Sequence, residues 1–84
     1  MIEIKLGDLA KILSGKLIGD PEQIVTGSVE TDSRLVGHGS LFFAKPGEET
    51  DGHKFVGSAL EKGCIAAVVE HQVSDQINQI IVTN

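Results

Sequence analysis

The stretch that decides the fold runs from Leu41-Phe42-Phe43-Ala44 to Ile65-Ala66-Ala67-Val68-Val69. Neither apolar run alternates with polar residues, which indicates strands that are covered on both faces. Between them, apolar residues recur at helical spacing and predict a helix over about 53–62, with Asp51 as its N-cap and Gly63 just past its end. A strand, a helix and a strand in this order predict one β-α-β crossover with parallel strands.

The residues on either side of this unit add shorter elements. Alternation over residues 2–6 predicts a strand or extended arm, and helical spacing predicts a helix from about Gly7 to Ser14. Asp8 suits the first turn of that helix, and Gly15 is the candidate residue just beyond its end. Short strands or extended segments are expected at 16–18, 24–26, 28–31 and 80–82. The sequence therefore predicts a small α/β domain with a mixed sheet and two or more helices.

Length and composition bound the class of protein. Residues 1–84 are enough for one small domain. A net charge of −5 without any run of Lys or Arg argues against binding to nucleic acid or to an anionic membrane surface. A single cysteine allows no disulfide within the chain, and no apolar run approaches the length of a membrane span. We expect a cytoplasmic, monomeric protein.

The first candidate site is Thr31-Asp32-Ser33-Arg34, which follows a predicted strand. Loops at strand ends are where α/β sheets bind ligands. Hydroxyl groups suit phosphate or uracil atoms, the fork of donors on Arg34 suits phosphate, and Asp32 could accept from a ligand or orient Arg34. The alternative is a capped turn with an Asp–Arg pair on the surface.

The second candidate site is the loop between Lys45 and Phe55. It joins a buried strand to a helix, and a helix N-terminus with glycines before it is suited to bind anions. The residues that we single out there are Lys45, Pro46, Gly47, Asp51, Gly52 and His53. The alternative is a plain strand-to-helix loop in which Asp51 caps the helix.

Other chemistry is not indicated. The sequence contains no P-loop, and His38, His53 and His71 lack the spacing of metal ligands. Cys64 leads into a buried strand and is expected to be a core residue. No nucleophile–base pair is visible. We therefore expect no catalytic residue, no metal and no cofactor in this chain.

Together these motifs resemble a known family. Thr31–Arg34, Leu41–Ala44, Pro46-Gly47-Glu48 and Asp51-Gly52-His53 are similar, in order and spacing, to the N-terminal domain of Mur ligases. The resemblance implies a three-domain ligase: this domain holds the UDP part of a UDP-N-acetylmuramoyl-peptide, a central domain binds ATP and magnesium, and a C-terminal domain brings the incoming amino acid or dipeptide. The domain alone would be inactive. The implied substrate-binding residues are Thr31, Asp32, Ser33 and Arg34 on one wall, and Lys45, Pro46, Gly47, Asp51, Gly52 and His53 on the other.

Two members of the family fit the pattern. The opening helix and Gly15-Lys16-Leu17-Ile18-Gly19 resemble the ligase that adds D-alanyl-D-alanine to the tripeptide, and the ligase that adds diaminopimelate or lysine is the alternative. His38-Gly39-Ser40 departs from the Pro-Gly-Asp that is usual in the family, which changes a turn. Lys45 directly before Pro46 also departs from the family pattern, which leaves open whether Lys45 contacts the phosphates. A stand-alone protein-interaction module is the alternative from another class.

Overall fold

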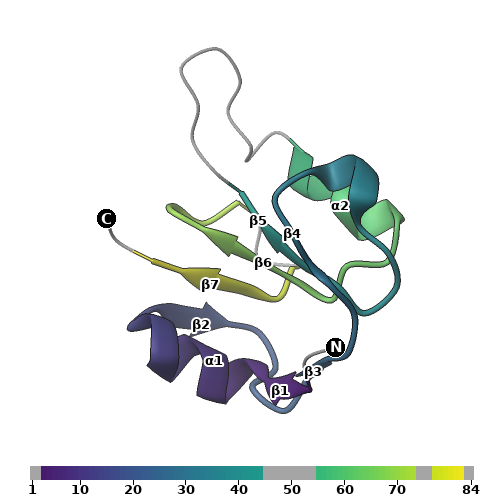
Figure 1. The fold of residues 1–84 in the computed structure, drawn as a ribbon. Helices are drawn as coiled ribbons and strands as arrows, with labels where there is room; N and C mark the ends of the chain where they lie inside the picture. The colour runs from purple at the N-terminus through teal and green to yellow at the C-terminus, as the bar shows by residue number, and fades with distance from the viewer. Residues whose placement is uncertain (1–2, 45–54, 74–76, 83–84) are drawn as a thin grey trace.

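A computed structural model describes residues 3–44, 55–73 and 77–82, and of Ser33 only the main chain. Its elements form a five-stranded mixed sheet, a separate two-stranded sheet and helices on both sides (Figure 1). In chain order they are β1 (Ile4–Lys5), α1 (Leu6–Leu13), β2 (Lys16–Ile18), β3 (Ile24–Val25), β4 (Val29–Glu30), the 3-10 turn η1 (Ser33–Leu35), β5 (Leu41–Phe43), α2 (Val56–Glu61), β6 (Ala66–Val69) and β7 (Gln79–Ile81). The predicted α/β domain with a mixed sheet is confirmed.

The large sheet has the strand order β2-β7-β6-β5-β4. β5 and β6 are parallel, with Phe42 opposite Ala67, as the crossover between them predicts. β4 is also parallel to β5, and β6 to β7, while β2 runs antiparallel to β7. The short strands β1 and β3 pair with each other, antiparallel, beside the large sheet. Four neighbouring strands therefore end at one edge, as ligand sites in open α/β sheets require.

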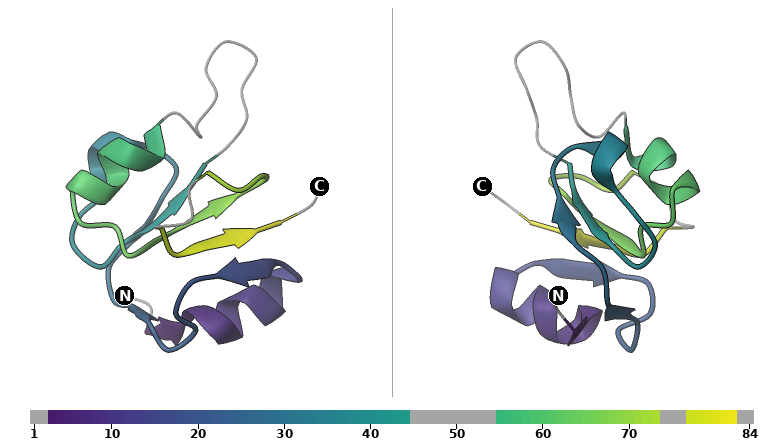
Figure 2. Two further views of the ribbon diagram at one scale, coloured as in Figure 1. Left: turned by 180° about the vertical axis from the view of Figure 1, so that it is seen from behind. Right: turned by 45° about the vertical axis from the view of Figure 1, so that its right-hand side comes forward.

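Both faces of the large sheet are buried, which explains the uninterrupted apolar runs. Phe42, Ala67 and Val69 pack with Val56 and Ala59 of α2 on one face. The alternate strand residues, with Ile80, pack against Leu6 and Ala10 of α1 on the other face: these are Leu41, Ala66 and Val68. Figure 2 shows α1 and α2 on opposite sides of the sheet. The three central strands β5, β6 and β7 thus each contribute to two separate cores, because side chains alternate along them.

Helix α1 ends differently from the prediction. Ser14, and not Gly15, adopts the left-handed conformation, with φ 55°. The N–H groups of Ser14 and Gly15 donate to the carbonyls of Lys11 and Ala10 at 3.2 and 2.9 Å, which satisfies two free carbonyls at the helix end. Gly15 is required for another reason: a Cβ there would lie 2.6 Å from Cγ2 of Ile80.

Helix α2 is shorter than the predicted helix over 53–62. It begins at Val56, and Phe55 occupies its N-cap position without a side-chain hydrogen bond. Asp51, the predicted N-cap, lies with the rest of segment 45–54 outside the described residues. The C-terminal prediction is confirmed, since Gly63 has φ 102°. None of the helices among the described residues is long and apolar enough to cross a membrane.

One polar side chain is wholly buried where β7 begins. Gln79 accepts a hydrogen bond from the main-chain N–H of Val73 at 2.9 Å and donates one to the carbonyl of Ile77 at 3.2 Å. Its amide therefore replaces water for two main-chain groups of the connection between β6 and β7. The glutamine thereby links Val73 to Ile77, on either side of residues 74–76, which lie outside the described residues.

Candidate functional site

The two predicted walls of the site leave the same edge of the sheet. β4 and β5 are parallel neighbours, with Glu30 opposite Phe42, so Thr31 and Ala44 follow the strands side by side. Figure 1 shows the chain after β4 curving from this edge into η1, which lies beside α2. The predicted residues of the second wall lie outside the described residues: Lys45, Pro46, Gly47, Asp51, Gly52 and His53. The structure therefore describes the first wall and the point where the second begins.

Asp32 and Arg34 form the best defined interaction of this wall. The Asp32 carboxylate accepts from the main-chain N–H of Arg34 at 2.9 Å and so caps η1. The same carboxylate accepts from Nε of Arg34 at 3.0 Å and from Nη2 at 2.8 Å. Thr31 is exposed beside them. The alternative of a capped turn with an Asp–Arg pair is confirmed as the local structure, and ligand binding by these residues stays a prediction.

The pair is ionised throughout the neutral range. Hydrogen bonds from the side chain and the main chain of Arg34 lower the pKa of Asp32 from 3.8 to about 2, and the charges of Arg34 and Lys62 act in the same direction. The Asp32 carboxylate in turn raises the pKa of Arg34. The two opposite charges cancel at long range, so this wall can attract an anion only through donors that point at it.

Near the amino end of β5, the segment before β4 and the segment after η1 pack directly against each other. The hydroxyl of the buried Ser40 accepts from the N–H of Gly37 at 3.1 Å and lies 3.3 Å from the hydroxyl of Ser28. A Cβ on Gly27 would lie 2.9 Å from N of Ser40, so two chain segments touch directly here. The sequence prediction treated this region only as a turn. Its signal is the pair of glycines before a serine that precedes a buried strand.

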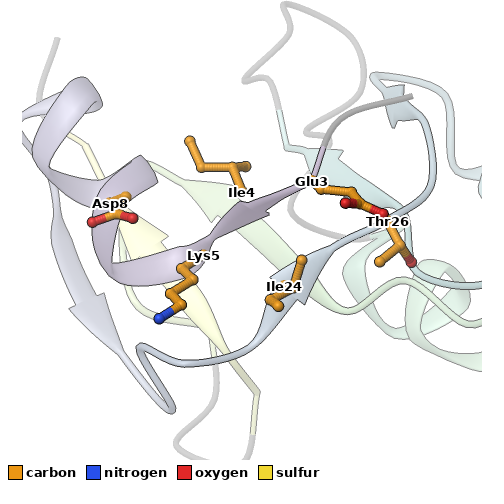
Figure 3. Close-up of a pocket in the computed structure, with 6 residues that line it drawn as sticks. All are labelled: Glu3, Ile4, Lys5, Asp8, Ile24 and Thr26. Carbon is orange, nitrogen blue, oxygen red and sulfur yellow. The ribbon is translucent and has the colours of Figure 1, made fainter.

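A surface hollow of about 430 Å³ lies elsewhere, between β1, β3 and the start of α1. Figure 3 shows its lining residues, among them Lys5 and Ile24, which project from adjacent strands. Lys5 is paired with the exposed Glu22 at 3.1 Å, an arrangement that contributes little energy. None of its lining residues is among the residues predicted for the site. It therefore adds no support to the predicted site.

Cys64 has a structural role, and the described residues contain no metal-binding cluster. Cys64 is buried in the core beside α2, as predicted, and burial raises the pKa of its thiol. Across the part of the chain that the structure describes, no three His, Cys, Asp or Glu side chains could together hold a metal ion.

Comparisons with known proteins converge on one family. Residues 26–84 match the model of the Mur ligase family, catalytic domain. The chain is 41% identical over 78 residues to a UDP-N-acetylmuramoyl-tripeptide–D-alanyl-D-alanine ligase of Mycobacterium leprae, covering 87% of this chain and 15% of that protein. It is 40% identical over 67 residues to a UDP-N-acetylmuramoyl-L-alanyl-D-glutamate–2,6-diaminopimelate ligase of Phocaeicola vulgatus, covering 75% of this chain and 14% of that protein. A crystal structure of MurF from Acinetobacter baumannii superposes with a TM-score of 0.83 at 29% identity, over 95% of this chain and 18% of that one.

Proposed function

We propose, because this chain belongs to the Mur ligase family, that it holds the UDP end of UDP-N-acetylmuramoyl-tripeptide for a ligase that adds D-alanyl-D-alanine. The chain spans less than a fifth of the length of the relatives described above. That it takes part in a ligation reaction is therefore also part of what we propose. ATP and magnesium would be held by a central domain of a longer polypeptide. The residues of this chain do not fit them, since the sequence has no P-loop.

The observation that carries the proposal is the exposed guanidinium of Arg34, held at the sheet edge where β4 and β5 end. Arginine presents paired donors that match two oxygens of a phosphate. Thr31 adds a hydroxyl at the same edge, where the loop after Ala44 also begins. A diphosphate lying across this edge would meet donors from both sides, while its uracil and ribose would need the second wall.

The choice between the two ligases rests on similarity. Relatives of both kinds match at about 40% identity. The match to the D-alanyl-D-alanine ligase of Mycobacterium leprae covers more of this chain, and the superposed crystal structure is a MurF. We therefore keep the diaminopimelate-adding or lysine-adding ligase as the alternative, which also implies a UDP-linked substrate.

The test is a titration of the 84-residue chain with UDP, followed by amide chemical shifts. We expect a weak affinity, because a site shared between domains lacks its other walls, and shifts concentrated at 31–34 and 45–53. Arg34→Gln should weaken binding about tenfold or more, the value of a charge-assisted hydrogen bond. Lys11→Gln is the matched control, since it removes one exposed positive charge on α1, on the other side of the sheet.

Two results would count against the site. Shifts confined to other regions, such as the hollow beside β1, would place the ligand elsewhere. Equal losses in Arg34→Gln and Lys11→Gln would reduce the effect to net charge. The stand-alone module is distinguished by the gene: an adjoining segment that encodes a P-loop supports the ligase, and a stop codon directly after Asn84 supports the module.

A further inference from the structure

The Arg34 guanidinium has two edges that can each bind a pair of oxygens. One edge carries the hydrogen of Nε and one hydrogen of Nη2, and the other carries one hydrogen each from Nη1 and Nη2. Asp32 occupies the first edge, with its oxygens 3.0 Å from Nε and 2.8 Å from Nη2. Among the described residues, no group accepts from the second edge. The Arg34 side chain is 83% exposed, against 35% for Asp32.

We propose that Asp32 is a positioning residue that fixes the guanidinium of Arg34 so that its second edge binds two oxygens of the substrate diphosphate. This inference rests on the proposed function. Asp32 itself does not touch the ligand, because its carboxylate is already committed to Arg34 and to the cap of η1. It therefore takes a different role from Arg34, although both belong to the same wall.

The physical reason is the freedom of the arginine side chain. An exposed arginine populates many rotamers, and binding must remove most of that freedom. Asp32 removes it before the ligand arrives, through three side-chain hydrogen bonds of 2.8 to 3.2 Å. Because the carboxylate also accepts from the main-chain N–H of Arg34, it fixes both ends of the same residue. A diphosphate would then meet a fork of donors that is already oriented.

A positioning role of Asp32 and a simple effect of its charge predict opposite changes in ligand affinity when the carboxylate is removed. Asp32 carries a negative charge close to the expected place of an anion, so as a charge alone it would repel the ligand. Removing that charge would tighten binding. If Asp32 orients Arg34, removing the charge weakens binding instead.

The test is Asp32→Asn in the 84-residue chain, with the UDP dissociation constant measured by amide shifts. Asparagine is as good a cap as aspartate, so the turn at η1 is retained. Asp20→Asn is the matched control: Asp20 accepts from the main-chain N–H of Glu22 at 2.9 Å in the same i to i+2 arrangement, in the turn between β2 and β3. We expect the dissociation constant to rise about fivefold in Asp32→Asn, the equivalent of one side chain newly immobilised on binding, and to stay unchanged in Asp20→Asn.

The same substitution in an Arg34→Gln background completes a double-mutant cycle. If Asp32 acts through Arg34, Asp32→Asn should not weaken binding further there. Unchanged or tighter binding by Asp32→Asn alone would overturn the inference, and an equal loss in both backgrounds would show that Asp32 contacts the ligand itself. A parent chain that does not bind UDP would overturn the proposed function, and this inference with it. A parent chain that binds UDP while Asp32→Asn has no effect would overturn the inference alone.

Discussion

Gly15→Ala should destabilise the fold, although alanine usually stabilises where glycine has an ordinary backbone conformation. Gly15 is not among the glycines with positive φ, so alanine fits its main chain and would on that ground add about 0.4–1 kcal/mol of stability. The added Cβ would however lie 2.6 Å from Cγ2 of Ile80, 2.9 Å from the carbonyl oxygen of Ile81 and 3.1 Å from Cγ1 of Val82. All three belong to β7 or follow it directly.

The surroundings cannot move aside at low cost. Ile80 is fully buried in the core on the α1 side, and β7 is held between β2 and β6. Inserting one methyl group into such packing costs about 1–3 kcal/mol. For a domain of this size, that loss lowers the melting temperature by roughly 5–20 °C.

Urea and thermal unfolding, followed by circular dichroism, measure the difference. Gly57→Ala is the matched control, since a Cβ at that position of α2 meets nothing within 4 Å. The control should gain up to about 1 kcal/mol from helix propensity. If Gly15→Ala were as stable as the parent chain, the close approach between the end of α1 and β7 would be refuted.

Three further outcomes are expected. Ser14→Gly should raise the free energy of unfolding by about 0.5–1 kcal/mol in urea titrations, because glycine adopts the left-handed conformation without strain; no gain would contradict that conformation. Gln79→Leu should lower it by about 1–3 kcal/mol in the same assay, since the main-chain groups of Val73 and Ile77 lose their partner; a neutral result would mean that water replaces the amide. Asp32 should titrate near pH 2 by carboxyl carbon NMR, not near its ordinary pKa of 3.8. Because the folded-state pKa is the lower one, the pair stabilises the fold above about pH 4 and stops doing so as the pH falls through about 2.

The parts of the fold that depend on local pattern could be predicted. The runs at 41–44 and 65–69 became neighbouring parallel strands, because a helix between two buried strands leaves few other arrangements. The antiparallel pairing of β2 with β7 and the separate β1–β3 pair could not be predicted, since these strands are short and their partners lie far away in the chain. Alternation shows which side of a strand is buried but not which strand lies beside it.

For the candidate site, the capped turn with an Asp–Arg pair could be predicted as an alternative, and ligand binding by these residues stays a prediction. The tetrapeptide was expected either to bind a ligand or to form a capped turn with a paired Asp and Arg, and the geometry of Asp32 and Arg34 lets both be true. The end of α1 shows the opposite case. Gly15 was expected to take the left-handed conformation at the end of the helix, but Ser14 takes it. Position 15 needs a residue without a side chain because β7 packs against it. That strand lies more than sixty positions later, so the local sequence could not reveal this need.

The pairing of β2 with β7 also sets the order in which the chain can be completed during its synthesis. Lys16 lies opposite Ile81, so β2 leaves the ribosome about 65 residues before its partner. At about 5–20 residues per second, the N-terminal helix and strand wait several seconds with the part of their apolar side that β7 covers still exposed. The face covered by α2 draws on residues 36–69 for its main contacts and can close first. Nascent chains arrested before residue 79 should therefore bind chaperones through the N-terminal third of this 84-residue segment.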